Sequence, residues 1–358
     1  MQLLRRKYKL SELYILRKSF FKLILSPKKL INFFLVKVSL FFKMKKCLGL
    51  PFNIFIEPTG NCNYRCVKCE KFSDKYVDDG PVFDGKNMPF EYYCRIIDDI
   101  GDTLLSLRLW HYGEPFLNSA IFDMVEYAKR KGIVVCISSN LSLLTEESVE
   151  KLIQSGLDYL IISFDGGSNK TYNLYHRRDY FNRVVDNIRT LVRSKKRLKS
   201  SSPFIELQFI VMKDNEEEMS VIRDLASELN VDKLTYLKLD ATKINFDTPE
   251  GPRSCADILP ENRDFTLDIK AINLINSCRI PWEEAVIRYS GAVLPCVTDI
   301  SQKYEVGNLF QNGDYLGFRK LWNNIHYRDF RHQIVADING NNICFNCAQR
   351  DNNTKDQI

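Results

Sequence analysis

Short apolar runs alternate with helical patterns through the middle of the chain. The predicted strands cover residues 54–57, 105–112, 133–139, 159–165, 204–212 and 234–239. Six such βα units with continuous apolar strands predict a parallel sheet covered by helices, either an open doubly wound sheet or a partial barrel. In both architectures chemistry collects at the carboxyl ends of the strands.

Helix signals between these runs support the alternation. Gly101, Gly132 and Gly156 each follow a helical pattern, at a position where a left-handed C-terminal cap is expected. Thr145 begins another helix, because its hydroxyl can cap the first turn and the acids after it favour the helix dipole. We therefore assign residues 51–242 to one α/β domain.

Two helices are predicted ahead of this domain, over residues 10–25 and 28–46, separated at Ser26-Pro27 because proline stops a helix. The second helix is amphipathic. One side carries Lys28, Asn32, Ser39, Lys43 and Lys46, and the other carries Ile31, Phe34, Leu35, Val38 and Phe42. Two interpretations stay open, a helix packed on its own domain or on a partner, and a peripheral anchor on an anionic membrane surface through residues 1–46.

Charge is distributed unevenly along the chain. Residues 1–46 contain 13 Lys and Arg and one acid, Glu12, whereas all 358 residues contain 51 Lys and Arg and 45 Asp and Glu. A leader of net charge +12 therefore precedes a body of net charge −6. By its charge the body is not a general binder of nucleic acid, and we expect no nucleic-acid partner.

Composition and segment lengths favour a cytoplasmic globular protein. The 45% hydrophobic and 27% charged residues exclude a disordered chain. The leader's neutral run 30–36 has seven residues, against roughly 20 for a membrane span. Lysine recurs through to Lys46, unlike the pattern of a signal peptide. We expect a reducing compartment, with a peripheral position on the inner face of the membrane as the alternative that the leader allows.

The composition of the sequence changes after residue 242. Residues 243–275 contain Pro249, Pro252 and Pro260 and are predicted to be a linker. Residues 276–358 form a smaller region that contains cysteines. The predicted organisation is thus a helical leader (1–50), an α/β domain (51–242), a linker (243–275) and a C-terminal module (276–358).

Three cysteines directly follow the first predicted strand. Cys62, Cys66 and Cys69 stand in a C-x3-C-x2-C arrangement. A structural zinc site needs four ligands, and no fourth Cys or His lies nearby. Thiolates are the usual ligands of iron-sulfur clusters, and three of them leave one iron of a four-iron cube open to a substrate or cofactor. This interpretation is favoured over zinc and over unligated structural thiols.

The stretch Glu-Pro-Thr-Gly-Asn-Cys-Asn-Tyr-Arg-Cys-Val-Lys-Cys over residues 57–69 resembles the radical S-adenosylmethionine (radical SAM) superfamily. The resemblance implies a partial (β/α)6 TIM-like barrel and a 4Fe–4S cluster whose open iron binds S-adenosylmethionine (SAM). It also implies reductive cleavage of SAM to a 5′-deoxyadenosyl radical that abstracts hydrogen from a C–H bond. Lys68 departs from the pattern, because many members have an aromatic residue before the last cysteine.

Three further motifs agree with this family in order and position. Gly113-Glu114-Pro115 ends the second strand and resembles the motif that receives the methionyl amino group. Arg177 is expected near the methionyl carboxylate, with His176 as a competitor because the alignment shifts by one residue there. Polar residues at the ends of the third and fourth strands suit the ribose hydroxyls and the methionyl carboxylate, namely Ser138, Asn140, Ser163 and Asp165.

A second cysteine group lies in the C-terminal module. Cys278, Gly291 and Cys296 are spaced C-x12-G-x4-C, and the pair Cys344-x2-Cys347 follows later. This spacing resembles the shortened SPASM module called a twitch domain, which binds one auxiliary 4Fe–4S cluster. With four cysteine ligands the natural role of such a cluster is electron transfer. A four-cysteine zinc ribbon is the alternative.

Four other residues are candidates for substrate chemistry. Cys255 lies in the linker, where its thiol is either idle or a hydrogen-atom donor to a substrate radical, as in sugar epimerases of this superfamily. Trp110, His111 and Tyr112 lie near the same strand end as Glu114 and are candidate substrate contacts, with core packing as the alternative.

The resemblance also bears on the reaction. Relatives with twitch modules include aminocyclitol dehydrogenases and aminoglycoside epimerases, which favours dehydrogenation or epimerisation of a polyol, sugar or lipid-linked glycan. The alternatives are a maturase of ribosomally made peptides and, without catalysis, a membrane-tethered iron-sulfur sensor or scaffold. Two 4Fe–4S clusters, SAM and an electron donor such as flavodoxin or ferredoxin are implied.

Overall fold

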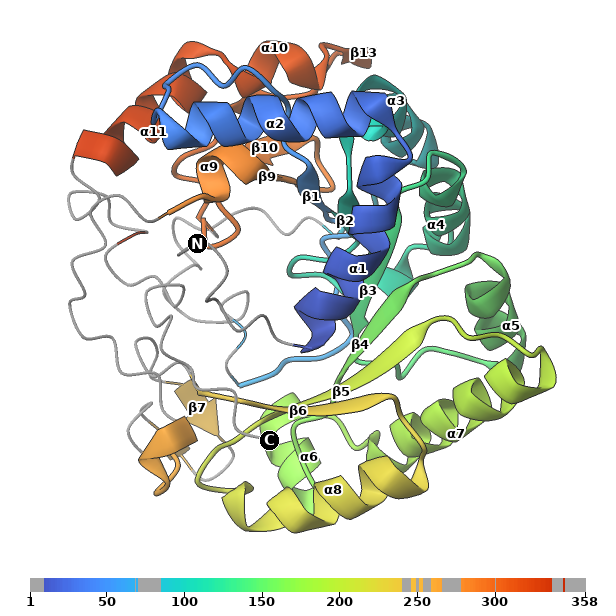
Figure 1. Ribbon diagram of the computed structural model, residues 1–358. Coiled ribbons are helices and arrows are strands. Elements are labelled where there is room, and N and C mark those ends of the chain that lie inside the picture. The colour runs from blue at the N-terminus through green and yellow to red at the C-terminus, as the bar shows by residue number, and fades with distance from the viewer. Residues whose placement is uncertain are drawn as a thin grey trace, which may run out of the picture.

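One nine-stranded sheet organises the part of the chain that the computed structural model describes, residues 10–67, 69, 85–239, 246–248, 251–253, 259–265, 278–299, 301–336 and 344 (Figure 1). Six of its strands are parallel and follow chain order, namely β1 (Asn53–Ile56), β2 (Ser106–Arg108), β3 (Val134–Ser139), β4 (Tyr159–Ser163), β5 (Phe204–Ile210) and β6 (Lys233–Leu237). The predicted α/β fold with a partial barrel is confirmed.

Helices cover the outer side of β1 to β6 (Figure 1). They are α3 (Phe90–Ile100), α4 (Ile121–Arg130), α5 (Glu146–Gln154), α7 (Phe181–Arg197) and α8 (Met219–Glu228), with the short α6 (Asn169–His176) before α7. In α3 the buried Tyr93, Ile96, Ile97 and Ile100 recur at helical spacing and face the core. Apolar burial of this kind fixes each helix against the sheet.

Most of the helix ends predicted from local sequence signals are confirmed. Thr145 caps α5 and forms a reciprocal capping box with Ser148. Gly132 and Gly156 have φ angles of 67° and 78°, which are the expected left-handed caps. The prediction for Gly101 was wrong, because its φ is −59° and the chain continues into a 3-10 turn. The second strand is also shorter than predicted, since residues 109–112 leave the sheet.

The C-terminal module extends the same sheet. β9 (Glu284–Ile287) pairs in parallel with β1, and β10 (Ala292–Leu294) and β11 (Gly307–Asn308) add antiparallel strands beyond it. Gly291 makes the turn between β9 and β10 with φ 89°, where a Cβ would lie 2.7 Å from the Asn308 side-chain oxygen. The module also contains β12 (Phe310–Gln311), β13 (Asp314–Tyr315), α9 (Ile280–Glu283), α10 (Phe318–Trp322) and α11 (Ile325–Ala336). A small hairpin, β7 (Phe246–Thr248) with β8 (Gly251–Arg253), lies within the predicted linker.

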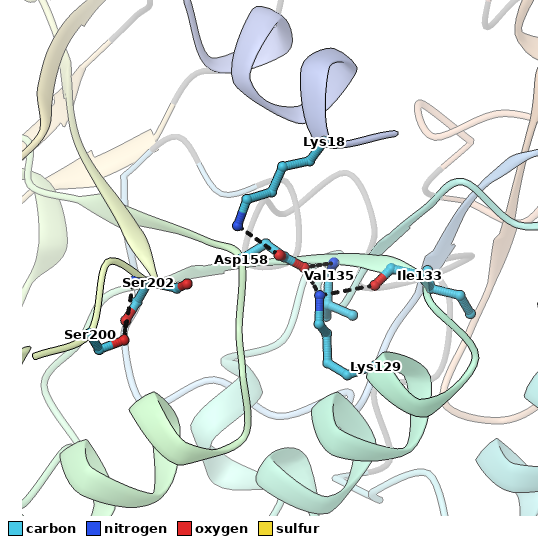
Figure 2. Close-up of polar contacts among 7 residues, drawn as sticks. All are labelled: Lys18, Lys129, Ile133, Val135, Asp158, Ser200 and Ser202. Carbon is cyan, nitrogen blue, oxygen red and sulfur yellow. Dashed lines mark hydrogen bonds and ion pairs between the residues drawn. The ribbon is translucent and has the colours of Figure 1, made fainter. Parts of the chain in front are cut away.

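The two predicted leader helices form α1 (Leu10–Ile24) and α2 (Pro27–Phe41). The second ends at Phe41 and not at Lys46 as predicted, because Lys43 adopts a left-handed φ of 50°. α1 lies against the amino-terminal ends of β3 to β5. Its Tyr14 ring packs 4.7 Å from the Phe204 ring, and the Lys18 ammonium lies 3.0 Å from the Asp158 carboxylate. Figure 2 shows that Asp158 also accepts hydrogen bonds from Lys129 and from the backbone N–H of Val135.

α2 and the segment after it connect the leader to the C-terminal module. Lys37 forms an ion pair with Glu283. The indole N–H of Trp322 donates to the carbonyl of Gly49 at 2.7 Å, and that of Trp282 donates to the carbonyl of Met44 at 2.9 Å. The leader is therefore packed on both parts of the body. None of the described helices is long and apolar enough to cross a membrane.

Candidate active site

The first cysteine group lies in the loop after β1, at the carboxyl end of the parallel sheet. Backbone hydrogen bonds hold this loop, since the N–H of Cys69 donates to the carbonyl of Cys66 at 3.0 Å and the N–H of Val67 donates to that of Tyr175 at 2.8 Å. The second bond ties the loop to α6. The predicted location of the cysteines beside the strand ends is thus what the structure shows.

The three thiols share one electrostatic environment. Burial raises the pKa of the Cys66 thiol well above its ordinary value, and the neighbouring Cys69 and Cys62 raise it further. A positively charged iron cluster would reverse this effect, because it stabilises thiolates. Within the described residues, no three His, Cys, Asp or Glu side chains gather closely enough to bind one metal ion. A four-iron cube binds one thiolate on each of three irons, so three cysteines in one loop are chemically suitable donors for it.

A buried histidine lies between the cysteine loop and the end of β4. The Nδ1 atom of His176 lies 3.2 Å from Cys66 Sγ, and its Nε2 atom lies 3.5 Å from the Asp165 carboxylate. Burial lowers the pKa of His176 to about 3, so the imidazole is neutral, and raises the pKa of Asp165 to about 7, so this carboxyl titrates near neutral pH. Asp165 also holds the end of β5, because it accepts the N–H of Ile210 at 2.7 Å.

Arg177 lies next to this histidine and ends α6 with a left-handed φ of 54°. Its Nε atom is buried and has no hydrogen-bond partner among the described residues. A buried guanidinium N–H in this state can donate a hydrogen bond to an anionic group such as a carboxylate. His176 contacts Cys66, and the predicted role of Arg177 toward the methionyl carboxylate stays a prediction.

Gly113 and Glu114 cross close to the cysteine loop. A Cβ on Gly113 would lie 1.9 Å from the carbonyl oxygen of Thr59, so only glycine allows the two backbones to approach. The N–H of Glu114 then donates to the carbonyl of Asn61 at 2.7 Å. The motif at the end of β2 therefore fixes the start of the cysteine loop.

The Glu114 carboxylate is buried, with 3% of the residue exposed. It accepts hydrogen bonds from Ser139 Oγ at 2.7 Å, from the Asn140 N–H at 2.9 Å and from the Phe116 N–H at 3.1 Å. Burial raises the pKa of Glu114 to about 7, although these bonds oppose the shift. A carboxylate offers about four lone pairs, so one remains to receive a donor such as an ammonium group.

The end of β3 supplies polar groups on both sides of the sheet. Ser139 contacts Glu114, whereas Ser138 alternates with it and lies on the opposite face, in register with Ile161 of β4. The Asn140 amide donates to the side-chain oxygen of Asn63 at 2.9 Å, which joins β3 to the cysteine loop. Sequence reasoning selected Ser138 and Asn140 but missed Ser139. The signal that could have identified it is its alternation with Ser138 beside Glu114.

The three candidate substrate contacts lie where the barrel meets the C-terminal module. Trp110 packs edge-on against Phe55 at 5.5 Å, in an apolar cluster, so its contacts are those of a core residue. His111 Nε2 lies 2.9 Å from the carbonyl of Val297, while its Nδ1 is buried with no hydrogen-bond partner among the described residues. The N–H of Tyr112 donates to Glu57 at 3.1 Å.

The cysteines of the C-terminal module have surroundings that differ from those of the first cysteine group. Cys296 and Cys344 are buried at 7% and 8% exposure, and Cys278 is half-buried against the same hydrophobic core. The Cys296 sulfur lies 3.2 Å from the Thr298 hydroxyl. Cys347 and Cys255 lie outside the described residues. The structure therefore describes three of the four predicted ligands.

Family models match both regions. A model of the radical SAM superfamily matches residues 56–226, and a model of the SPASM iron-sulfur cluster-binding domain matches residues 278–348. The cofactor-modifying protein of tungsten-containing aldehyde ferredoxin oxidoreductase from Pyrococcus furiosus is 24% identical, over 80% of this chain and 80% of its own length. Mycofactocin maturase MftC from Mycolicibacterium smegmatis is 23% identical, over 86% of this chain and 78% of its own. An AdoMet-dependent heme synthase from Methanosarcina barkeri is 30% identical, but the match spans less than half of either chain.

Solved structures share the fold. Streptococcus suis SuiB bound to the precursor peptide SuiA superposes with a TM-score of 0.56 at 16% identity, over 79% of this chain and 67% of that one. Native anSMEcpe with bound AdoMet gives a TM-score of 0.56 at 14% identity, over 86% of this chain and 92% of that one. At these identities the likeness concerns the fold.

Proposed function

Because the chain belongs to the radical SAM superfamily and carries a C-terminal SPASM module, we propose that it removes hydrogen from a C–H bond of a polar substrate, a polyol, sugar or lipid-linked glycan. Family membership implies SAM, a 4Fe–4S cluster in the barrel and auxiliary iron-sulfur binding in the SPASM module. When bound, SAM and the reduced cluster supply a radical that can take a hydrogen atom from carbon. The enzyme needs an electron donor, for which we propose flavodoxin or ferredoxin.

The chain's own residues have separable roles toward this cofactor. Cys62, Cys66 and Cys69 would hold the cluster and leave one iron open. The buried Glu114 carboxylate would receive the methionyl ammonium, and Arg177 would face the methionyl carboxylate. Hydroxyl and amide groups at the ends of β3 and β4 would orient the remaining part of SAM. The fully ligated auxiliary cluster would involve Cys278, Cys296, Cys344 and Cys347.

The observation that carries the substrate proposal is the polarity of the inner face of the sheet, the face opposite α3, α4, α5, α7 and α8. Alternation places hydrophobic residues on the outer face, where they form the main core. Strand register places polar residues on the inner face beside apolar ones such as Phe55, Val134 and Ile161. The polar residues are Asn53, Ser106, Arg108, Ser138, Ser163, Glu206, Gln208, Lys233 and Thr235. An inner face of this kind suits a substrate rich in hydroxyl groups.

Glu206 is the centre of this polar face and is fully buried. Its carboxylate accepts hydrogen bonds from the hydroxyls of Tyr159 and Thr235 and lies 3.5 Å from the Lys233 ammonium. Further along the sheet, Arg108 lies 3.6 Å from Glu284 of the C-terminal module. These paired charges make the inner face hydrophilic, which suits a polar substrate better than an apolar one.

Two outcomes of the reaction differ in the step after hydrogen abstraction. In dehydrogenation the substrate radical loses one electron to the auxiliary cluster and one proton to a base, so two hydrogens leave the substrate in total. In epimerisation the radical regains a hydrogen atom from a thiol on its other face, and Cys255 is the candidate donor. Replacement of Cys255 by Ala distinguishes them, because only epimerisation would be lost.

A second candidate function is maturation of a ribosomally made peptide. Mycofactocin maturase resembles this chain over most of both lengths, and SuiB shares the fold in a complex with its precursor peptide. A peptide backbone would also match alternating donors and acceptors on the inner face. The proposal for a polyol or glycan and this alternative therefore require a direct comparison of substrates.

The test is deuterium transfer under anaerobic conditions. Reconstituted enzyme, SAM and a reductant are incubated with deuterated polyols, lipid-linked sugars or precursor peptides, and 5′-deoxyadenosine is analysed by mass spectrometry. Deuterium in 5′-deoxyadenosine from a polyol or sugar supports the proposal. Deuterium from peptides alone establishes the second function instead. An enzyme with both clusters that forms no 5′-deoxyadenosine contradicts both and favours an iron-sulfur sensor or scaffold.

A further inference from the structure

α2 packs on the body with its polar side and presents its apolar side outward. Asn32 and Ser39 are 6% and 0% exposed, and Lys29 is 4% exposed. By contrast, Phe34 and Phe41 are 58% and 79% exposed. Val36, at 0% exposure, is the apolar residue buried among the polar ones, whereas an ordinary surface helix buries its whole apolar stripe.

Specific hydrogen bonds hold this orientation. The Asn32 side chain accepts the N–H of Leu50 at 2.8 Å and donates to the carbonyl of the same residue at 2.9 Å. Ser39 Oγ accepts the N–H of Leu48 at 2.8 Å, and the Lys29 ammonium donates to the carbonyl of Leu104. Rotation of α2 to bury its apolar side would leave these buried groups without partners, so the exposure is built into the packing.

The exposed apolar residues are concentrated in one part of the chain. Of the thirteen large hydrophobic residues exposed among the described residues, ten lie between positions 20 and 42. Five on α2 recur at helical spacing and form one stripe. We call the whole set the outward apolar surface, which consists of Phe20, Phe21, Ile24, Leu25, Ile31, Phe34, Leu35, Val38, Phe41 and Phe42.

Charge around this surface identifies the kind of partner that fits it. No acidic residue occurs from residue 13 to residue 46, and this segment carries five exposed basic residues, of which Lys28 pairs with Asp102 of the body. They are Arg17, Lys22, Lys28, Lys45 and Lys46. Two copies of the chain meeting here would bring like charges together. Anionic lipid headgroups, in contrast, match the lysines, while the acyl region receives the phenylalanines.

We propose that the outward apolar surface is an interfacial membrane-binding surface, through which the enzyme lies on an anionic bilayer with α2 parallel to the membrane plane. The contacts of α1 with Asp158 and of Lys29 in α2 with the carbonyl of Leu104 connect the two helices to the barrel. The inference does not depend on the proposed reaction, because binding is measured without turnover.

Vesicle flotation of the full-length protein tests this surface. Vesicles of phosphatidylcholine with about one third phosphatidylglycerol are compared with vesicles of phosphatidylcholine alone, at about 0.1 M and 0.5 M salt. The protein is expected to float with the anionic vesicles at low salt at least about tenfold more than with neutral ones. Failure to float with anionic vesicles at low salt would overturn the proposal.

Matched variants locate the binding. Phe34→Ser with Phe41→Ser removes two exposed aromatic residues from the stripe and is expected to weaken partitioning by at least about tenfold. The control, Val221→Ser with Ile325→Ser, changes exposed apolar residues elsewhere, at 50% and 56% exposure, and is expected to bind as the wild type does. Equal loss in both variants would contradict the proposal. So would a concentration-dependent dimer that the Phe variant abolishes while flotation is unchanged.

Discussion

The two cysteine groups differ in the residues that surround them. Cys66 lies in a loop beside ionisable groups, with His176 at 3.2 Å and Glu114 at the neighbouring strand end. Cys296 and Cys344 are buried in the main hydrophobic core of the molecule. The first environment offers several donors and acceptors to a bound molecule, whereas the second is mainly apolar, with the Thr298 hydroxyl beside the Cys296 sulfur.

This difference matches two kinds of iron-sulfur chemistry. A site that must open one iron to a cofactor needs polar groups that orient the cofactor, and burial of Glu114 makes its charge responsive to an incoming ammonium. A saturated cluster that only transfers electrons benefits from an apolar surrounding that excludes water. We therefore expect substitutions in the two regions to separate SAM cleavage from product formation.

Loss of one ligand in the first group should have the largest effect. Cys62→Ala is expected to lower 5′-deoxyadenosine formation by at least about three orders of magnitude, because the cluster with an open iron is no longer held. The measurement is chromatography of 5′-deoxyadenosine after anaerobic incubation. Cys94→Ala, which changes a half-buried cysteine of α3, is the control and should retain activity. Cleavage at the wild-type rate by Cys62→Ala would refute the assignment of this group.

Loss of a ligand in the second group should uncouple the reaction. Cys344→Ala is expected to keep 5′-deoxyadenosine formation within about threefold of the wild type while it lowers product formation by about a hundredfold, since the electron acceptor is missing. Both compounds are measured in the same incubation. A parallel fall of the two would show that the C-terminal module supports the fold or the first cluster instead.

Glu114→Gln should have an intermediate effect that depends on pH. In the wild type the pKa of Glu114 is raised to about 7, so ionisation increases about tenfold between pH 6 and pH 8 and SAM binding should tighten with it. The amide keeps the size but cannot ionise, so binding should be weaker by about tenfold at pH 8 and lose this pH dependence. Calorimetric titration with SAM measures both. A variant that retains the wild-type slope would exclude Glu114 as its source.

The same carboxyl should affect stability with the opposite sign. Without SAM, a folded pKa of about 7 against an ordinary value of 4.5 means that the folded chain binds the proton more tightly. The protonated Glu114 carboxyl therefore adds fully to the free energy of unfolding below pH 4.5, and this contribution is lost as the pH rises through about 7. The variant Glu114→Gln, which cannot ionise, should lose less stability than the wild type over this pH range. Thermal midpoints of the SAM-free protein at pH 5 and pH 8 measure it, and equal pH profiles for both proteins would contradict it.

The smallest effect is expected where the leader meets the C-terminal module. Trp322→Phe removes the hydrogen bond to Gly49 and keeps most of the ring packing. The thermal midpoint should fall by about 2–4 °C with little change in 5′-deoxyadenosine formation. Calorimetry of the reconstituted protein measures the shift. Loss of cleavage without a shift in the midpoint would contradict a purely structural role.

Much of the fold and the candidate site could be predicted from the sequence. The six barrel strands were predicted because short runs rich in apolar residues recur between helical patterns, and Glu114 was predicted because its motif follows the second of them. The leader shows what the sequence could not predict. Helical spacing tells which residues of α2 share a side, but Asn32 turns inward only because Leu50 offers it two backbone partners. Such pairings, like that of β9 with β1, arise between distant segments and leave no local signal.

Iron and sulfide content after anaerobic reconstitution tests the central claim, two separate iron-sulfur sites, most directly. The wild type is expected to bind about eight irons and the variant with Cys62, Cys66 and Cys69 all changed to Ala about four, with matching sulfide. About four irons in the wild type and none in the variant, with zinc present in both, would contradict the account. The C-terminal module would then be structural, and a reaction that needs a second electron carrier would be excluded.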